Sequence, residues 1–128
     1  MNRNFKPIIV KHLTSTLDNV KLIYLFGSMS NGSDRYSSDI DIAVLCNEPV
    51  DKLMLWNCAQ DLAIQFGRDV DLIDLTSCST VLAMQVTQTG ELLYGSEPDD
   101  FRFNLKTMSM YQRLQEERKL IVDSFYLG

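Results

Sequence analysis

The chain has 128 residues, of which 45% are hydrophobic and 23% charged, an ordinary composition for one globular domain spanning residues 1–128. Twelve basic and 17 acidic residues give a net charge of −5, and such a chain lacks the positive surface of a general nucleic-acid binder. We therefore expect no direct nucleic-acid binding, and the absence of any run of 18 apolar residues predicts no membrane span.

Hydrophobic periodicity predicts four helices and four strands. In chain order these are a helix over 5–17, strands over 21–26 and 39–45, a helix over 51–66, a strand over 68–75, a helix over 79–88, a strand over 91–94, and a helix from 99 to about 126. The polar segment 27–38 is long for a hairpin connection and is expected to carry function. This order indicates an α/β or α+β fold, with a mixed β-sheet flanked by helices and a long C-terminal helix.

Apolar spacing also predicts which sides of the helices are buried. For the helix over 51–66, the expected buried side comprises Leu53, Leu55, Trp56, Ala59, Leu62, Ala63 and Phe66. The last helix is expected to be capped by Asp99 or Asp100. Its apolar stripe consists of Phe101, Leu105, Met108, Tyr111, Leu114, Ile121, Val122 and Phe125. This stripe either covers the sheet or leaves a C-terminal end, including Tyr126 and Leu127, for a partner.

The cysteines and the single histidine exclude several kinds of site. Cys46, Cys58 and Cys78 are widely spaced and form no CxxC pair, so a zinc knuckle or a thioredoxin-type site is not expected. Reduced, mostly buried thiols in a cytoplasmic protein are the expected alternative. Because His12 is the only histidine, a multi-histidine metal site is excluded.

Acidic residues on two of the predicted strands indicate a metal site. Asp39 and Asp41 are two residues apart, so their side chains project from the same face of a strand. Carboxylates that close raise each other's pKa unless a cation lies between them, and Mg²⁺ commonly binds one or two carboxylates together with phosphate oxygens. If strand 68–75 lies beside strand 39–45, Asp71 completes a three-carboxylate cluster that can hold two metal ions. Asp69 and Asp74 flank Asp71, and simple solvation is the structural alternative for each of the three; Asp69, which shares the parity of Asp71, is the alternative third acid.

A glycine and a serine precede the acidic pair. Gly27 allows the backbone to approach a phosphate closely, and the hydroxyl and N–H groups at Ser28 can donate hydrogen bonds to its oxygens. A phosphate-binding turn together with paired carboxylates is the minimum for phosphoryl or nucleotidyl transfer. The chain contains no G-x-x-x-x-G-K-[ST] motif, which excludes Walker-type phosphate binding. Ser28 as a simple turn residue and the acids as exposed strand-end residues are the structural alternatives.

These residues together resemble a known family. Gly27-Ser28, ten intervening residues, Asp39-Ile40-Asp41 and a later Asp71 are similar to the signature of the DNA polymerase β-like nucleotidyltransferase superfamily. The resemblance covers roughly residues 24–75. The small size resembles the minimal nucleotidyltransferase (MNT) group, whose members are commonly antitoxins paired with a HEPN-domain ribonuclease toxin. Two positions of the loop differ from the family pattern, because Met29 and Asn31 stand where relatives often have basic residues.

The resemblance implies a nucleotidyltransferase fold and assigns roles to individual residues. It implies a two-metal Mg²⁺ site held by Asp39, Asp41 and Asp71, with ATP as the expected nucleotide. Asp71 is expected to bind the metal nearest the acceptor hydroxyl and to act as its general base or orienting group. The nucleotide-binding residues implied are Gly27, Ser28 and Arg35, the last as the triphosphate contact.

The implied activity is that of a protein adenylyltransferase (AMPylase) acting as an antitoxin. It would transfer AMP from ATP to a tyrosine hydroxyl of a cognate HEPN toxin and thereby silence the toxin. Two alternatives remain open from the sequence. One is a non-catalytic antitoxin that neutralises its toxin by binding; the other is a small-molecule nucleotidyltransferase of the aminoglycoside-modifying type.

Overall fold

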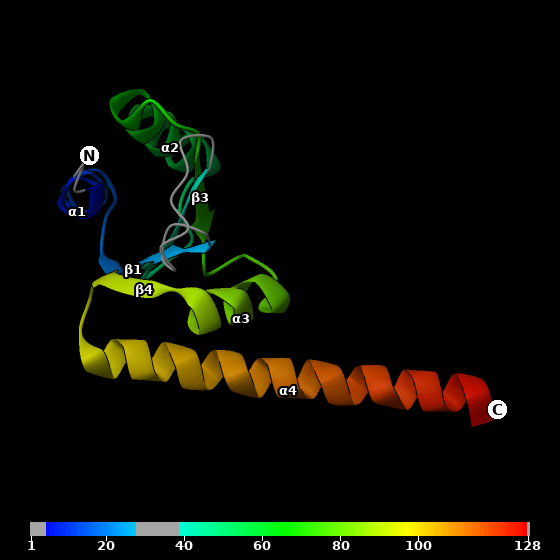
Figure 1. Ribbon diagram of the computed structural model, residues 1–128. Coiled ribbons are helices and arrows are strands. Elements are labelled where there is room, and N and C mark those ends of the chain that lie inside the picture. The colour runs from blue at the N-terminus through cyan, green and yellow to red at the C-terminus, as the bar shows by residue number, and fades with distance from the viewer. Residues whose placement is uncertain (1–4, 28–38, 128) are drawn as a thin grey trace.

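Four strands form a mixed sheet at the centre of the molecule (Figure 1). The structure, a computed structural model, describes residues 5–27 and 39–127. The strands are β1 (Val20–Phe26), β2 (Ile40–Cys46), β3 (Val70–Asp74) and β4 (Glu91–Tyr94), in the spatial order β3-β2-β1-β4. Strand β1 pairs antiparallel with β2 and β4, whereas β2 and β3 are parallel. The predicted mixed sheet is therefore confirmed.

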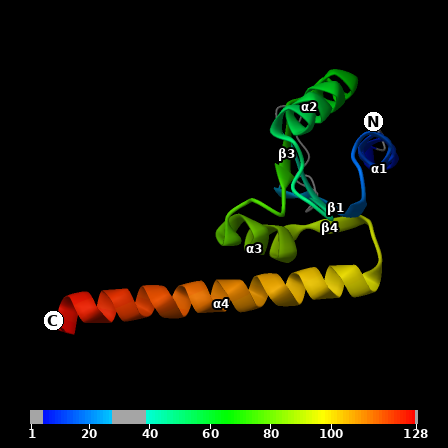
Figure 2. The same cartoon turned by 180° about the vertical axis from the view of Figure 1, so that it is seen from behind.

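Helices cover both faces of this sheet (Figures 1 and 2). Helices α1 (Phe5–Thr16) and α2 (Lys52–Phe66) pack on one face, and α3 (Thr80–Thr89) and α4 (Glu97–Leu127) lie on the other. Alternation along the strands supplies both cores, since Ile42 faces α1 and α2 while its neighbour Ala43 faces α3 and α4. The sheet is thus buried on both sides, which holds its strand ends in fixed positions.

Local signals explain where two of the helices begin and end. The Asp51 side chain accepts a hydrogen bond of 3.1 Å from the N–H of Met54 and so caps α2, while Gly67, at φ 65°, ends it. The predicted cap of the last helix is wrong. Helix α4 begins at Glu97, and the Ser96 hydroxyl accepts a hydrogen bond of 3.2 Å from the N–H of Asp99. Serine is as good a cap as aspartate, and it stands one turn earlier.

The expected burial of α2 is partly wrong. Leu53 and Trp56 are 66% and 60% exposed, whereas Ala59, Leu62 and Phe66 are buried. Cys58, which apolar spacing does not place on the buried side of this helix, is also buried. Because α2 contacts the sheet mainly through its later turns, apolar residues in its first turns remain in solvent.

Helix α4 extends well past the sheet (Figures 1 and 2), and its predicted apolar stripe does not cover the sheet. Phe103 and Thr107 are its buried residues instead. Several stripe residues are at least half exposed: Phe101, Leu105, Met108, Ile121, Val122 and Phe125. The alternative in which the stripe packs on the sheet is therefore wrong. The alternative in which its C-terminal end stays accessible agrees with the structure.

The thiols are buried or half-buried and free. Cys46 and Cys58 are buried and Cys78 is half-buried, as expected from the sequence. Burial raises the pKa of all three thiols above the ordinary value, so they are poor nucleophiles. None of the helices in residues 5–27 and 39–127 is long and apolar enough to cross a membrane.

Candidate active site

The strand topology brings the predicted acidic residues to one edge of the sheet. Because β1 and β2 are antiparallel, the last residue of β1, Phe26, pairs with Asp41 near the start of β2. Because β2 and β3 are parallel and in register, Asp41 also pairs with Asp71 on β3. Asp39 immediately precedes β2, and Gly27 immediately follows β1. The three acids and the glycine thus come from three adjacent strand ends.

The carboxylates of Asp41 and Asp71 project from the same face of the sheet. Register partners on parallel strands point to the same side, and Asp41 has the same parity as Ala43, which packs against α3 and α4. Asp41 is half-buried, whereas Asp39 and Asp71 are exposed. A ligand can therefore approach Asp41 from the side on which Asp39 and Asp71 lie.

The carboxylates of Asp39 and Asp71 repel that of Asp41. Burial raises the pKa of the Asp41 carboxyl above its ordinary value, and the negative charges of Asp71 and Asp39 raise it further. Each cause disfavours the charged form of Asp41. A cation placed among these three carboxylates would reverse the effect, so the electrostatics favour a site for a positive ion.

Gly27 is held against the acidic group. Its φ of 75° lies in the left-handed region, and a Cβ at this position would come closer than 3.0 Å to Oδ2 of Asp41 and within 3.4 Å of its Cγ. Any other residue would therefore be strained in its backbone and would displace the carboxylate. Both requirements explain a glycine directly after β1.

The donor set fits a divalent cation. In the part of the chain that the structure describes, no three Asp, Glu, His or Cys side chains are gathered as a ready-made metal cage. The three acids are therefore interacting neighbours in the present arrangement rather than a complete ligand set. Mg²⁺ needs only one or two carboxylates, with water and phosphate oxygens as its other ligands. Asp41 with one of its two neighbours meets that need.

The two acids that flank Asp71 do not pair with Asp41. Asp74 is 5% exposed, and its carboxylate accepts hydrogen bonds from the N–H of Val50 at 2.8 Å and from the N–H and hydroxyl of Thr76 at 3.0 and 2.8 Å. It is a structural residue that joins the segment before α2, at Val50, to the segment after β3, at Thr76. Asp69 is exposed, and its carbonyl oxygen accepts a bond of 2.9 Å from the N–H of Ile40. Asp71 is thus the only one of the three that pairs with Asp41.

The predicted nucleotide contacts Ser28 and Arg35 lie outside the described residues. Sequence reasoning missed the packing of Gly27 on Asp41. The only signal for it was the position of the glycine directly after an apolar strand.

Comparisons with known proteins identify relatives of the chain. The family described as "Polymerase beta, Nucleotidyltransferase" matches residues 9–99. The chain is 50% identical over 115 residues to the protein adenylyltransferase MntA of Shewanella oneidensis, covering 90% of this chain and 83% of that protein.

Two solved structures are similar over most of the chain. One is a crystal structure of a toxin–antitoxin with AMP-PNP, with a TM-score of 0.88, 47% identity, and coverage of 94% of this chain and 98% of that one. The other is a tri-AMPylated Shewanella oneidensis HEPN toxin in complex with an MNT antitoxin, with a TM-score of 0.81, 45% identity, and coverage of 94% and 95%. From the family match and these identities, the chain belongs to the polymerase β nucleotidyltransferase family.

Proposed function

We propose that this chain is an Mg²⁺-dependent protein adenylyltransferase that acts as an antitoxin. It would transfer AMP from ATP to a tyrosine hydroxyl of a cognate HEPN toxin. The observation that carries the proposal is the pairing of Asp41 with Asp71 beside Gly27, in a chain that is 50% identical to a protein adenylyltransferase. The similar tri-AMPylated toxin complex supports a HEPN toxin as the acceptor. The proposal further takes the chain to be one catalytic domain that works in the cytoplasm.

Different residues would bind the metal ion and accept the proton during transfer. Asp39 and Asp41 would hold Mg²⁺, which when bound supplies positive charge to the phosphates of ATP. The hydroxyl oxygen of the acceptor forms a bond to the α-phosphorus, and the bond from that phosphorus to the pyrophosphate oxygen breaks. Asp71 is exposed next to Asp41, where it can orient the acceptor hydroxyl and accept its proton.

The phosphates would be held at the end of β1. Gly27 has no side chain between its backbone and the Asp41 carboxylate, so a phosphate can come close to both. Ser28 and Arg35 remain predicted phosphate contacts. Arg35→Ala is expected to raise the KM for ATP and to leave kcat nearly unchanged, because charge pairing with the triphosphate contributes mainly to binding.

The accessible end of α4 is the surface that we propose for the toxin. Leu120, Ile121, Val122, Phe125 and Tyr126 are each at least 50% exposed and follow one another over the last two turns. Contiguous exposed apolar residues on an isolated helix are typical of a protein-binding segment. The similar solved structures of toxin–antitoxin complexes support a protein partner for the chain.

One experiment separates the proposed enzyme from its two alternatives. The purified chain is incubated with Mg²⁺, ATP labelled at the α-phosphate, and the purified cognate HEPN toxin. We expect label on a toxin tyrosine, and no label with the double variant Asp39→Asn, Asp41→Asn. Toxin inhibition without any label would identify a non-catalytic antitoxin. Label on an added aminoglycoside but not on the toxin would identify a small-molecule enzyme.

A further inference from the structure

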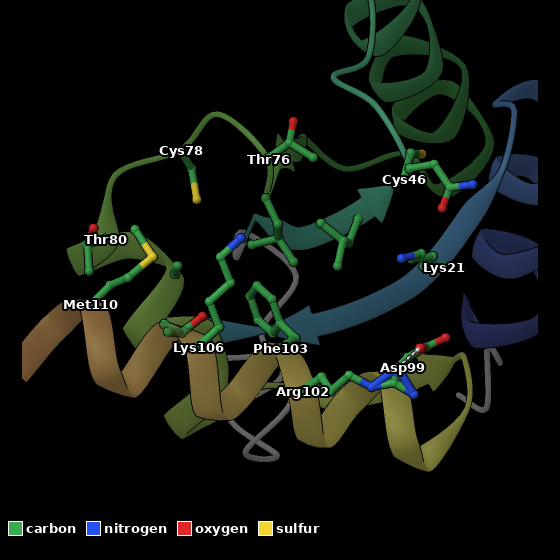
Figure 3. Close-up of a pocket in the computed structure, with 15 residues that line it drawn as sticks. Lys21, Cys46, Thr76, Cys78, Thr80, Asp99, Arg102, Phe103, Lys106 and Met110 are labelled. Atoms are coloured by element: carbon green, nitrogen blue, oxygen red, sulfur yellow. Dashed lines mark ion pairs between the residues drawn. The ribbon is translucent and has the colours of Figure 1, made fainter.

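A cavity of about 420 Å³ opens between the sheet and the N-terminal half of α4 (Figure 3). Its walls come from the start of β1, the ends of β2 and β3, the first turns of α3, and α4. Pockets of 300–1,000 Å³ with an apolar floor and a few polar groups are typical ligand sites. Nothing in the proposed transfer reaction uses this cavity.

The cavity is separate from the acidic group. It is lined by Leu45 and Cys46 at the end of β2, whereas Asp41 lies near the start of that strand. Leu45 lies four residue steps along the strand from Asp41, which is roughly 13 Å. The cavity and the acids therefore occupy opposite ends of the same face of the sheet.

The mouth of the cavity is positively charged, although the whole chain carries a net charge of −5. Lys21, Arg102 and Lys106 line it, and Asp99 is the one carboxylate among the described residues of its lining. Asp99 lies 3.8 Å from Arg102, while Lys21 and Lys106 form no ion pair with any carboxylate among the described residues. The ammonium groups of Lys21 and Lys106 are therefore available to bind an anionic ligand.

The side chains converge from different elements. Figure 3 shows Lys106 reaching from α4 toward the sheet, with Lys21 on β1 and Thr76 after β3 around the same space. The Thr80 hydroxyl also lines the cavity and adds a donor that suits a phosphate oxygen, whereas the Thr76 hydroxyl already donates to the Asp74 carboxylate. Charge-assisted hydrogen bonds from several directions are the usual way in which a phosphate is held.

The floor of the cavity is apolar. Leu75, Ala83 and Phe103 line it and are each at most 9% exposed. A free inorganic anion would gain nothing from such a floor. A ligand with an organic part would bury that part against Phe103 while its phosphate remained at the cationic mouth.

We propose that this cavity binds a phosphorylated small molecule of about the size of a mononucleotide, at a site that is independent of the transfer reaction. Its phosphate contacts Lys21 and Lys106, and its organic part packs on Phe103. Because the walls belong to both the sheet and α4, the bound ligand also braces α4 against the sheet.

The test uses the full chain in EDTA, so that no divalent metal recruits a nucleotide to the acids. Binding of AMP and of inorganic phosphate is measured by calorimetry and by amide chemical shifts. We expect AMP to bind more tightly than phosphate, with shift changes at Phe103 and Thr76. The double variant Lys21→Gln, Lys106→Gln should weaken AMP binding at least tenfold. Lys119→Gln, an exposed change farther along α4, and Asp41→Asn should leave it unchanged.

Four results would overturn the proposal. These are no AMP binding at millimolar concentration, unchanged affinity in the double lysine variant, loss of binding in Asp41→Asn, and equal affinities for AMP and phosphate. The third would move the nucleotide to the acidic group, and the fourth would identify a site for free phosphate only. Unchanged melting temperatures of the glutamine variants establish that weaker binding reflects the lost charges.

Discussion

Gly27 packs its Cα against the carboxylate of Asp41, so closely that no Cβ can be placed between them. The contact joins the end of β1 to the start of β2. In the proposed reaction the triphosphate binds beside this contact, next to the acids. A methyl group at position 27 would collide with the Asp41 carboxylate.

Gly27→Ala is expected to abolish most nucleotide transfer. The added methyl group would displace the Asp41 carboxylate, and the left-handed backbone adds strain of roughly 1–2 kcal/mol. Gly67→Ala is the matched control, because Gly67 has a φ of 65° and open space where a Cβ would stand. Steady-state transfer and melting curves are measured for both variants. Similar destabilisation with activity lost only in Gly27→Ala is expected; equal activities would contradict a catalytic role for the contact.

Asp71→Asn is expected to lower kcat for transfer by about 10²–10⁴-fold, because it removes the group that, in the proposed reaction, accepts the proton of the acceptor hydroxyl. Asp69→Asn is the matched control, because Asp69 is exposed and has the same strand parity as Asp71. It should leave kcat unchanged, since Asp69 does not pair with Asp41. Single-turnover label transfer measures both. A larger loss in Asp69→Asn than in Asp71→Asn would reverse the assignment of the third acid.

Asp41→Asn is expected to be as stable as the parent or slightly more stable in the absence of metal. Because the pKa of Asp41 is raised in the folded state, its charged carboxylate lowers the free energy of unfolding. This loss of stability is absent below the unfolded pKa and grows as the pH rises through the folded pKa. The asparagine should remove this loss of stability. Melting curves at pH 3.5 and pH 7 measure the difference between the two proteins.

The same variant should lose the stabilisation given by Mg²⁺ and ATP. A ligand that binds only the folded parent raises its free energy of unfolding by about 2.7 kcal/mol at 100 times its Kd. Melting curves with Mg²⁺-ATP and with ATP in EDTA measure the gain. A full ligand-induced shift in Asp41→Asn would place the metal elsewhere.

Tyr24→Phe is expected to loosen the attachment of α4. The buried Tyr24 hydroxyl donates a hydrogen bond to Oδ1 of Asp100, which also accepts one of 3.2 Å from the Asn104 amide. Loss of the first bond should lower the free energy of unfolding by about 1 kcal/mol. Chemical denaturation at neutral pH measures this change.

The same tyrosine predicts a loss of stability at alkaline pH. Burial, and then the Asp100 side chain, raise the pKa of Tyr24 far above its ordinary value. The unfolded chain therefore releases this proton first, so stability falls as the pH rises above about 10. This part of the loss should be absent in Tyr24→Phe and present in Tyr94→Phe, whose ring is partly exposed. Identical alkaline profiles of the two variants would contradict it.

Ile121→Ser and Phe125→Ser are expected to weaken toxin binding without changing the melting temperature, because both side chains are at least 70% exposed. Leu53→Ser on α2 is the matched control, since it removes a similarly exposed apolar side chain on the other face of the sheet. Calorimetric affinities for the toxin measure the effect. Equal affinities for all three variants would exclude the end of α4 as the docking surface.

The order of the elements and the acidic motif could be predicted from the sequence. Periodicity and cap residues depend on neighbours in the chain, so α2, ended by Gly67, and the separate strands near Asp39, Asp41 and Asp71 could be predicted, whereas the pairing of those strands could not. Strand parity leaves Asp69 and Asp71 as candidates for the third acid, because side chains alternate strictly along a strand, and the family resemblance selects Asp71 between them. These are local properties, and local physics is sufficient for them.

Which side chains are buried and which meet depends on the tertiary structure. Asp74 is structural because Val50, distant in the chain, donates a hydrogen bond to it. The α4 stripe stays exposed because the helix extends past the sheet that could have covered it, and periodicity carries no information on where a sheet ends. The contact of Gly27 with Asp41, and the cavity beneath α4, likewise arise from segments that come together only when the strands pair.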